Sequence, residues 1–492
     1  MTSSVSTRKS ALPPLTPGPH RERLGLISIV ACFGGLLFGY DTGVSNGAEH
    51  PMQLELGLDN LSLGVAISSL VFAAAVGALL GGQVSDAWGR RRAIILFAVL
   101  FFSGTLFVVF SPNFGLLVAG RILVGLAVGG ASTVVPVYLA ELAAVEIRGS
   151  ITGRNELAIV IGQLAAFVMN AIIGTVLGDL DGVWRIMFSV CALPAVALFV
   201  GMLRMPESPR WLIEKGHHEQ ALAVLKTVRS EERAIAELAE VQRLAAEERG
   251  HHQVGVRAIL TNKWLIRILL VGIGVAVAQQ LTGINSIMYY GQRVLIEAGF
   301  TASAALVANI ASGVFAVIGG IVALHNMDKV DRRKTFAIGL SLTTACHLLI
   351  GTASMTLPVG NALRPYVLLF LIVAFVFSMQ SCLNVAVWVW LAEVFPLHMR
   401  GLGIGVAVFF GWFVNALLAL FFPSLVTAVG ITGAFFLFAG IGAVALLFVV
   451  TQVPETRGRS LETLEQDITS GTAYDFRKTN RVTQEAPAAP SR

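Results

Sequence analysis

The stretch DAWGRRRAIILFAVLFFSGTLFVVF, Asp86–Phe110, decides the fold, because a short basic segment is followed at once by a long apolar run. A helix needs ~20 mostly apolar residues to cross a bilayer, and basic residues gather at the cytoplasmic ends of such helices. Runs of this kind recur through most of the 492 residues. The sequence therefore predicts an all-α membrane protein that crosses the bilayer many times.

The composition excludes most other classes of protein. Hydrophobic residues make up 55% of the chain and charged residues 13%, and the mean hydropathy is +0.75. Soluble domains contain ~25% charged residues, so a soluble enzyme of this size is excluded. The net charge is only +5, and no basic run is interleaved with aromatic residues. We expect the lipid bilayer and a small molecule as partners, and no nucleic acid.

Twelve apolar runs have spanning length, six on each side of a polar stretch. They lie near residues 25–47, 62–85, 93–111, 114–142, 151–175, 184–204, 264–291, 302–325, 335–355, 365–395, 402–427 and 430–451. The polar stretch has apolar residues every three or four positions, which is typical of surface helices.

These runs divide the chain into five parts. We expect a disordered N-terminal tail at 1–24, six-helix bundles at 25–205 and 264–452, linker helices at 206–263, and a C-terminal tail at 453–492. The basic residues of the short loops predict the orientation, since they are enriched on the cytoplasmic side. Ten follow even-numbered spans: Arg90, Arg91, Arg92, Arg148, Arg154, Lys329, Arg332, Arg333, Lys334 and Arg400. The other side has Arg293 and Arg364, with Arg185 at its edge. Both termini and the linker should thus be cytoplasmic, in the plasma (inner) membrane.

Three polar motifs occur twice, in the same order, in the two halves of the chain. They are DAWGRRR (Asp86–Arg92) and DKVDRRK (Asp328–Lys334), ELAAVEIRG (Glu141–Gly149) and EVFPLHMRG (Glu393–Gly401), and PESPRWL (Pro206–Leu212) and PETRGRS (Pro454–Ser460). A duplicated six-helix unit is the architecture of secondary transporters, which hold substrate between the halves near the middle of the membrane. A structural or sensory membrane protein on the same scaffold is the alternative.

The motifs of the whole chain resemble the sugar porter family of the major facilitator superfamily. The resemblance is carried by GYDTGVSNGA (Gly39–Ala48), GRILVGLAVGG (Gly120–Gly130), PVYLAE (Pro136–Glu141), PESPRWL, QQLTGINSIMYY (Gln279–Tyr290) and PETRG (Pro454–Gly458). Within the family, Arg154–Gly174 and the pair Trp184–Arg185 look most like bacterial myo-inositol/proton symporters. The resemblance implies the two-bundle major facilitator fold and transport by alternating access.

The chain departs from the family pattern at several positions. Ala87 replaces a basic residue of the first gating motif, and Asp331 replaces a glycine of the second. Asn384-Val385 replaces a Gly-Pro pair in span 10, which predicts the loss of a proline kink. Gly411 stands where some relatives have a glutamine that contacts sugar.

Asp41 lies inside span 1, where an ionisable residue costs ~2.5–3.5 kcal/mol on insertion scales and is therefore a functional candidate. Its expected partner is Arg121 in span 4. The resemblance implies that this pair couples transport to the proton, because facilitative relatives tend to have a neutral residue at the aspartate position. A permanent structural ion pair is the alternative.

The resemblance and the side-chain chemistry together predict a substrate site of carboxylate and amide groups. Glu156 can accept from two adjacent hydroxyls of a polyol. The alternatives are a second protonation site, or a carboxylate that faces a water-filled cavity without touching substrate. Gln163, in the same span, is also predicted to bind substrate. Gln279, Gln280 and Asn285 both donate and accept, but they share one face only if span 7 loosens at Thr282 and Gly283.

Trp388 matches a tryptophan that stacks on sugar in relatives. Trp412, Asn384 and Asn415 are expected to serve packing or helix contacts, and the amides of span 7 could also join helices.

Gates are predicted on both sides of the membrane. Tyr289 and Tyr290, with Ile284, are expected to form the outer gate. The duplicated charges are expected to form ion pairs that join the halves when the protein is open outward and separate when it opens inward. These cytoplasmic gate residues are Asp86, Arg90, Arg91, Glu141, Arg148, Asp328, Arg332, Arg333, Glu393 and Arg400.

These observations predict a proton-coupled symporter that imports a cyclitol or monosaccharide, with myo-inositol as the expected substrate. A facilitative hexose or pentose carrier and a non-transporting nutrient sensor are the alternatives. We expect no enzymatic activity, no cofactor besides the coupling proton, no metal site and a monomer. The four cysteines, Cys32, Cys191, Cys346 and Cys382, lie in apolar segments and predict no disulfide framework.

Overall fold

Long helices separated by short turns make up the structure, which is a computed structural model that describes residues 13–16, 18–248, 262–326, 329–396, 399–457 and 461–472. The first bundle contains α1 (Pro19–Leu56), α2 (Asn60–Trp88), α3 (Arg90–Val109), α4 (Phe114–Leu142), α5 (Arg148–Val176), α6 (Val183–Ser189) and α7 (Ala192–Leu203), with a short 3-10 turn at Val145–Ile147. α6 and α7 together form the sixth span. α1 begins at Pro19, so the end of the predicted N-terminal tail is helical.

The second bundle is less regular than the first. It contains α12 (Lys263–Leu281), α13 (Ile284–Ala298), α14 (Ala302–Asn326), α15 (Arg332–Thr356), α16 (Arg364–Met379), the π-helix η2 (Gln380–Asn384), α17 (Val385–Val394) and α18 (Arg400–Gln452). α12 and α13 form one broken span, and α16, η2 and α17 form another.

Eleven segments of the described residues are long and apolar enough to cross a membrane. The last of them, Gly401–Gln452, has 52 residues, more than twice the ~20 that one crossing needs. Its backbone departs from helical geometry at Gly430, where φ is 68°. Because two spans meet at Gly430, the chain has the predicted twelve crossings in two bundles.

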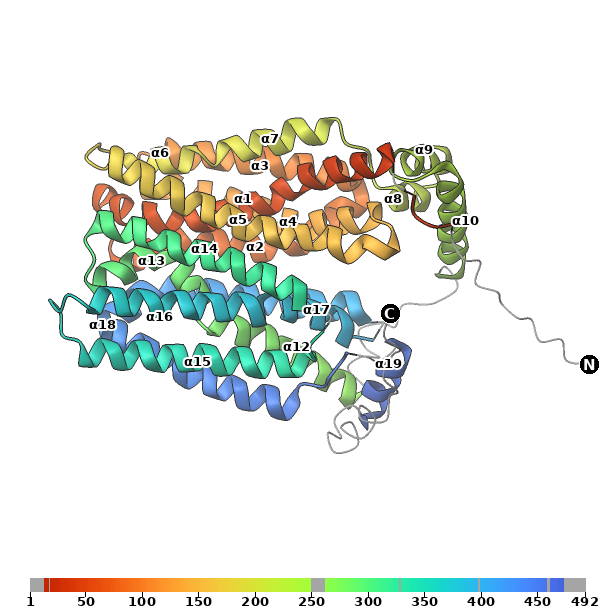
Figure 1. Cartoon of the computed structure of the whole chain (residues 1–492). Coiled ribbons are helices and arrows are strands. Elements are labelled where there is room, and N and C mark those ends of the chain that lie inside the picture. The colour runs from red at the N-terminus through yellow and green to blue at the C-terminus, as the bar shows by residue number, and fades with distance from the viewer. Residues whose placement is uncertain are drawn as a thin grey trace, which may run out of the picture.

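The linker helices lie together at one end of both bundles (Figure 1). They are α8 (Pro209–Glu214), α9 (His218–Val228) and α10 (Glu231–Glu248), and α19 (Leu461–Ser470) lies at the same end. We call this end the linker side. A helix in the predicted C-terminal tail was not expected from the sequence.

Buried arginines fasten the linker to the first bundle. Arg229 donates to the carbonyl of Leu142 at the end of α4, at 2.9 Å. Arg233 pairs with Glu146 at 2.9 Å, in the turn between α4 and α5. A hydrogen bond from its own backbone N–H, followed by the Arg233 guanidinium, lowers the pKa of Glu146, so this carboxylate stays charged.

Glycine allows the closest helix contact in the first bundle. Gly35, Gly39, Gly43 and Gly47 recur at every fourth position of α1 and face α5. A Cβ at Gly39 would lie 1.8 Å from the carbonyl oxygen of Ile159, which is a backbone atom and has no rotamer to move to. Small residues at this spacing bring two membrane helices together and thereby fix the side chains on the neighbouring faces of α1.

Replacing Gly39 with alanine should therefore destabilise the first bundle by about 1–3 kcal/mol through overpacking. The measurement is the melting temperature of the detergent-solubilised protein, followed by tryptophan fluorescence. Gly25→Ala is the matched control in the same helix, because a Cβ there meets nothing within 4 Å. Equal melting temperatures for the two variants would contradict this account of the α1–α5 contact.

Candidate functional site

Asp41 and Arg121 form the predicted ion pair inside the first bundle. Nη1 of Arg121 lies 3.0 Å from Oδ1 of Asp41, and the two residues are 1% and 2% exposed. The guanidinium also donates to Ser45 Oγ at 3.0 Å and to the carbonyl of Ala66 at 3.3 Å. The second carboxylate oxygen of Asp41 has no hydrogen-bond partner. The arginine is therefore well satisfied, whereas the carboxylate keeps one oxygen on which a proton could be held.

Gln163 lies two helical turns after Glu156 on α5. α5 meets α1 through Ile159 and Gln163, and it meets α14 of the second bundle through Leu164 and Phe167. Helical geometry places Glu156 on the same stripe as Gln163, between these two contact faces. Glu156 is half-buried, and Gln163 is buried with a carbonyl oxygen that has no partner. The two predicted substrate ligands thus lie where the bundles meet.

Span 7 breaks where the sequence predicts that it loosens. α12 ends at Leu281, Gly283 adopts the left-handed region with φ 79°, and α13 begins at Ile284. The break does not bring the three amides into one cluster. Asn285 donates to Gln280 at 2.7 Å, while Gln279 donates to Asn384 of span 10 at 3.1 Å.

Span 10 is irregular despite the absence of proline. A π-helical turn, η2, occupies Gln380–Asn384 and so includes Asn384, the first position of the usual Gly-Pro pair. The prediction from the lost proline was therefore incomplete, because a π-turn interrupts the span at the same place. Trp388 is half-buried one turn later. Trp390 of the same span is fully buried and donates to the carbonyl of Pro454 at 3.0 Å.

The two predicted outer-gate tyrosines are completely enclosed. Tyr290 donates to the carbonyl of Ala419 in α18 at 2.7 Å, and its ring stacks on Phe422 at 5.4 Å. Tyr289 is 1% exposed, with Thr42 of α1 and Asn415 of α18 beside its hydroxyl. Both tyrosines belong to α13, a helix that lies on the side opposite the linker (Figure 1).

Asn46, for which no role was predicted, joins the bundles on that opposite side. Its amide nitrogen donates to the carbonyls of Ile287 and Met288 at 3.0 and 2.9 Å. Its amide oxygen accepts from the backbone of Gln292 and from Asn309, both at 2.8 Å. One buried side chain of α1 therefore makes four hydrogen bonds to α13 and α14, and this side of the protein is closed.

An ion pair crosses the same boundary. Arg293 of α13 lies 3.7 Å from Glu49 of α1 and donates to Asn60 of α2 at 3.2 Å. Asn60 in turn donates to Thr427 of α18 at 3.0 Å. This contact was not predicted, because the predicted first span ends at residue 47, whereas α1 continues to Leu56.

The gate charges of the first bundle pair with one another on the linker side. Arg90 bonds Asp86 and Glu141, each at 3.0 Å. The backbone N–H of Arg91 donates to Glu207 at 3.0 Å. Arg148 donates to the carbonyl of Ala140 at 3.1 Å. Arg90 thus reaches Glu141 of α4 from the start of α3.

The second bundle repeats this arrangement. Arg332 bonds Glu393 at 3.1 Å, and the backbone N–H groups of Arg332 and Arg333 both donate to Glu455 at 2.9 Å. Arg400 begins α18, and Asp328 lies outside the described residues. Each gate pair given above lies within one bundle. This is the separated arrangement that the sequence analysis expected when the protein opens inward.

Asp331, which replaces a glycine in the second gating motif, forms two ion pairs. It pairs with Lys334 at 2.7 Å and with Arg457 at 3.3 Å. The hydrogen bond from Lys334, followed by that from Arg457, lowers the pKa of Asp331. The replacement of glycine therefore adds a charge to the second network without leaving it unpaired.

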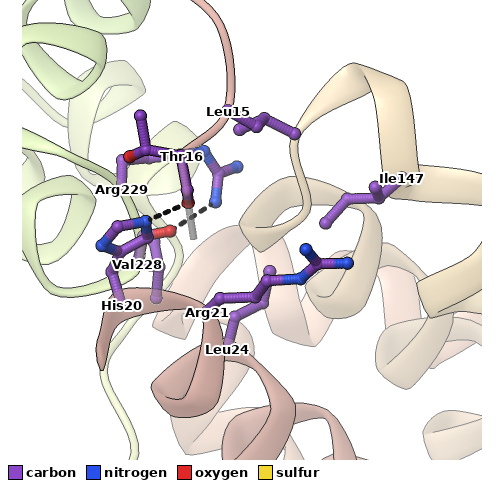
Figure 2. A pocket seen from close by; sticks show the side chains of 8 residues that line it. All are labelled: Leu15, Thr16, His20, Arg21, Leu24, Ile147, Val228 and Arg229. Carbon is purple, nitrogen blue, oxygen red and sulfur yellow. Dashed lines mark hydrogen bonds between the residues drawn. The ribbon is translucent and has the colours of Figure 1, made fainter. Parts of the chain in front are cut away.

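Two cavities lie away from the bundle interface. One, of about 80 Å³, is enclosed by the N-terminal segment, α1 and α9, where His20 bonds the carbonyl of Thr16 at 2.7 Å (Figure 2). The other, of about 250 Å³, lies between α14, α15 and η2 and is lined in part by Ser381 and Cys382. Neither contains the predicted substrate residues. Among the described residues no group of three His, Cys, Asp or Glu side chains could hold a metal ion.

The fold and this site define a membrane transporter built from two six-helix bundles. Residues 27–468 match the family model described as sugar (and other) transporter, and the chain belongs to that family. It is 47% identical over 460 residues to the major myo-inositol transporter IolT of Bacillus subtilis (strain 168), covering 93% of this chain and 96% of that protein.

The chain is also similar to solved structures of sugar transporters. The chain is similar to the xylose transporter XylE from E. coli in a partially occluded inward-open conformation, with a TM-score of 0.78 and 28% identity, covering 89% of this chain and 100% of that chain. It is also similar to the proton:xylose symporter XylE bound to 6-bromo-6-deoxy-D-glucose, with a TM-score of 0.75 and 28% identity, covering 90% of this chain and 99% of that chain.

Asn46→Ala should weaken the closure opposite the linker, because it removes four hydrogen bonds between the bundles, each worth about 0.5–1.5 kcal/mol. Spin labels on cysteines introduced at the exposed positions Leu61 of α2 and Val429 of α18 would report the distance across this side. The variant should gain a population with a longer distance.

Asn170→Ala is the matched control for this measurement. Asn170 is also a buried amide, and it also donates to a carbonyl of α1, that of Gly43 at 2.9 Å, but both residues lie in the first bundle. Its loss should leave the label distance unchanged. The same distance distribution in Asn46→Ala and wild type would show that Asn46 does not hold this side closed.

Proposed function

We propose that the protein is a proton symporter that imports myo-inositol by alternating access. The similarity to a myo-inositol transporter across nearly the full length of both chains supports the substrate. The similarity to a proton:xylose symporter supports the coupling ion. Energy comes from the proton gradient, and the reaction forms and breaks no covalent bond.

The observation that carries the proposal is the buried Asp41–Arg121 pair with one carboxylate oxygen unpartnered. A charged carboxylate enclosed in the membrane is stable only while its guanidinium stays close. A movement that separates or dehydrates the pair leaves a charge without compensation, and binding a proton removes that cost. Proton binding then depends on conformation, and by linkage substrate binding depends on the proton.

Substrate recognition falls to Glu156 and Gln163 of the first bundle and to Gln279, Gln280, Asn285 and Trp388 of the second. A cyclitol presents hydroxyl groups all round its ring, and amides match them because they both donate and accept. Glu156 adds two charge-assisted acceptors for adjacent hydroxyls. Trp388 offers a flat apolar surface for the axial hydrogens of the ring.

The linker side is assigned to the cytoplasm, because the basic residues of the short loops gather there. The host membrane is then the bacterial cell membrane, with both termini inside and the protein acting as a monomer. The hydrogen bonds of Asn46 close the outer side, with Tyr289 and Tyr290 in the same contact, and the intrabundle pairs of Arg90 and Arg332 accompany inward opening.

Asp41→Asn should abolish uphill accumulation of labelled myo-inositol while leaving exchange of labelled for unlabelled substrate. The amide keeps the shape and can accept from Arg121, but it takes up no proton at physiological pH. The measurement is uptake by proteoliposomes with and without an acidic exterior.

Asp179→Asn, in the exposed turn after α5, is the matched control and should behave as wild type. Uphill transport that persists in Asp41→Asn would remove this residue from the coupling step. Wild-type uptake that equilibrates but never exceeds the external concentration would identify a facilitative carrier instead.

Glu156→Gln should shift the preference between myo-inositol and hexoses, because it replaces one charge-assisted acceptor by a donor. Competition of unlabelled glucose, xylose and myo-inositol against labelled substrate measures the shift, and we expect myo-inositol to lose about tenfold relative to glucose. Glu297→Gln, near the far end of α13, is the control for loss of a carboxylate. An unchanged competition profile would place Glu156 outside the substrate site.

A further inference from the structure

Two interruptions of helical structure face each other in the second bundle. One is the break of span 7 between α12 and α13, and the other is the π-helix η2 of span 10. Thr282, at the break, lies 3.5 Å from the sulfur of Met379, which precedes η2. The hydroxyl of Thr282 also donates to the carbonyl of Gln279 at 2.6 Å, so the last turn of α12 is tied to the break.

A row of three amides connects these interruptions. Nε2 of Gln279 donates to Oδ1 of Asn384 at 3.1 Å. Nδ2 of Asn384 donates to Oε1 of Gln380 at 2.8 Å. We call these three residues the amide row. Gln279 and Gln380 are each 5% exposed, so water competes little for these bonds.

The π-helix is supported from behind by two glycines. A Cβ at Gly319 of α14 would lie 2.9 Å from Cβ of Gln380 and 3.0 Å from the carbonyl oxygen of Phe377. A Cβ at Gly339 of α15 would lie 2.7 Å from Cβ of Cys382. Because both helices approach the π-helix this closely, its side chains have little freedom to shift.

We propose that Asn384 is a positioning residue that strengthens substrate binding by fixing the amide of Gln279. The inference rests on the proposed function in one respect, namely that Gln279 binds the substrate. Asn384 uses its oxygen for Gln279 and its nitrogen for Gln380, so the amide plane of Gln279 is held in one orientation. The second N–H and the carbonyl oxygen of Gln279 then remain for one hydroxyl of a ring in a defined direction.

The amide row also gives Asn384 a part in the conformational cycle. The break of span 7 and the π-turn of span 10 are the irregular elements on which these spans can bend. Gln279 and Asn384 link the two spans by a buried hydrogen bond. The spans must therefore bend together, or this hydrogen bond must break. Asn384, which the sequence predicts to serve packing or helix contacts, thus acts on the ligand through Gln279.

A double-mutant cycle on substrate binding tests the positioning role. Gln279→Leu and Asn384→Leu should each weaken equilibrium binding of labelled myo-inositol about tenfold, and the double variant should weaken it by about the same tenfold rather than a hundredfold. Once Asn384 is replaced, the Gln279 amide is no longer oriented and contributes little to binding. Replacing Gln279 as well then weakens binding no further. A merely structural role of Asn384 would give effects that multiply.

Two controls make the cycle specific. Gln163→Leu combined with Asn384→Leu should give multiplied effects, because Gln163 lies in the first bundle. Ser381→Ala alters the same π-turn outside the amide row and should leave binding unchanged.

A second variant leaves both members of the key bond in place. Gly319→Ala should push Gln380 and reduce binding in the same direction, while Gly320→Ala, whose Cβ would meet Val160 at an ordinary 3.5 Å, should not. Gly319→Ala and Gly320→Ala replace the cycle as the test if Asn384→Leu is unstable. The melting temperature of Asn384→Leu would reveal this.

Multiplied effects of Gln279→Leu and Asn384→Leu, or equal binding by Gly319→Ala and Gly320→Ala, would overturn the inference. Its failure is distinct from a failure of the proposed function. The cycle is run with whichever of myo-inositol, glucose and xylose the wild type binds, and a wild type that prefers glucose revises the substrate while leaving the cycle valid.

Discussion

The guanidinium of Arg121 is the group on which the first bundle depends. It is enclosed in a membrane-embedded interior, and it is satisfied only because α1 supplies Asp41 and Ser45 while α2 supplies the carbonyl of Ala66. Three helices must therefore keep a fixed relation around one charge. The glycines of α1 make this possible, since they bring α5 against one face of the helix while its polar face remains turned to Arg121.

The duplicated motifs make equivalent hydrogen bonds in the two bundles. Glu207 accepts from the backbone at the start of α3, and Glu455 accepts from the backbone at the start of α15. A carboxylate at a helix N-terminus satisfies N–H groups that have no partner within the helix and complements the helix dipole. Tyr138 donates to the carbonyl of Pro206, and Trp390 donates to that of Pro454. Each bundle thus closes its linker side with the segment that follows its sixth span.

Spans and buried charges could be predicted because a bilayer imposes strong constraints on both. Apolar length identified the crossings, and the cost of a charge in lipid singled out Asp41 and Arg121. The break at Gly283 could also be predicted, because a glycine follows Thr282 among the polar residues of span 7, although the break does not bring the three amides together.

The contacts of Asn46 and Glu49 could not be predicted from the sequence. They depend on how the two bundles pack and on a first helix that continues past Pro51. The π-turn at Gln380–Asn384 carries no periodic signal of its own. The pair of Glu141 with Arg90 could not be predicted for a related reason, since spacing along one helix says nothing of an arginine at the start of α3.

The attachment of the linker to the first bundle has a mechanical consequence. Arg229 and Arg233 bind α9 and α10 to the end of α4 and to the turn before α5. The linker helices are therefore expected to move together with the first bundle when the two bundles rotate relative to each other. A probe domain inserted at the unobstructed turn around Gly216 would report the tilt of that half alone.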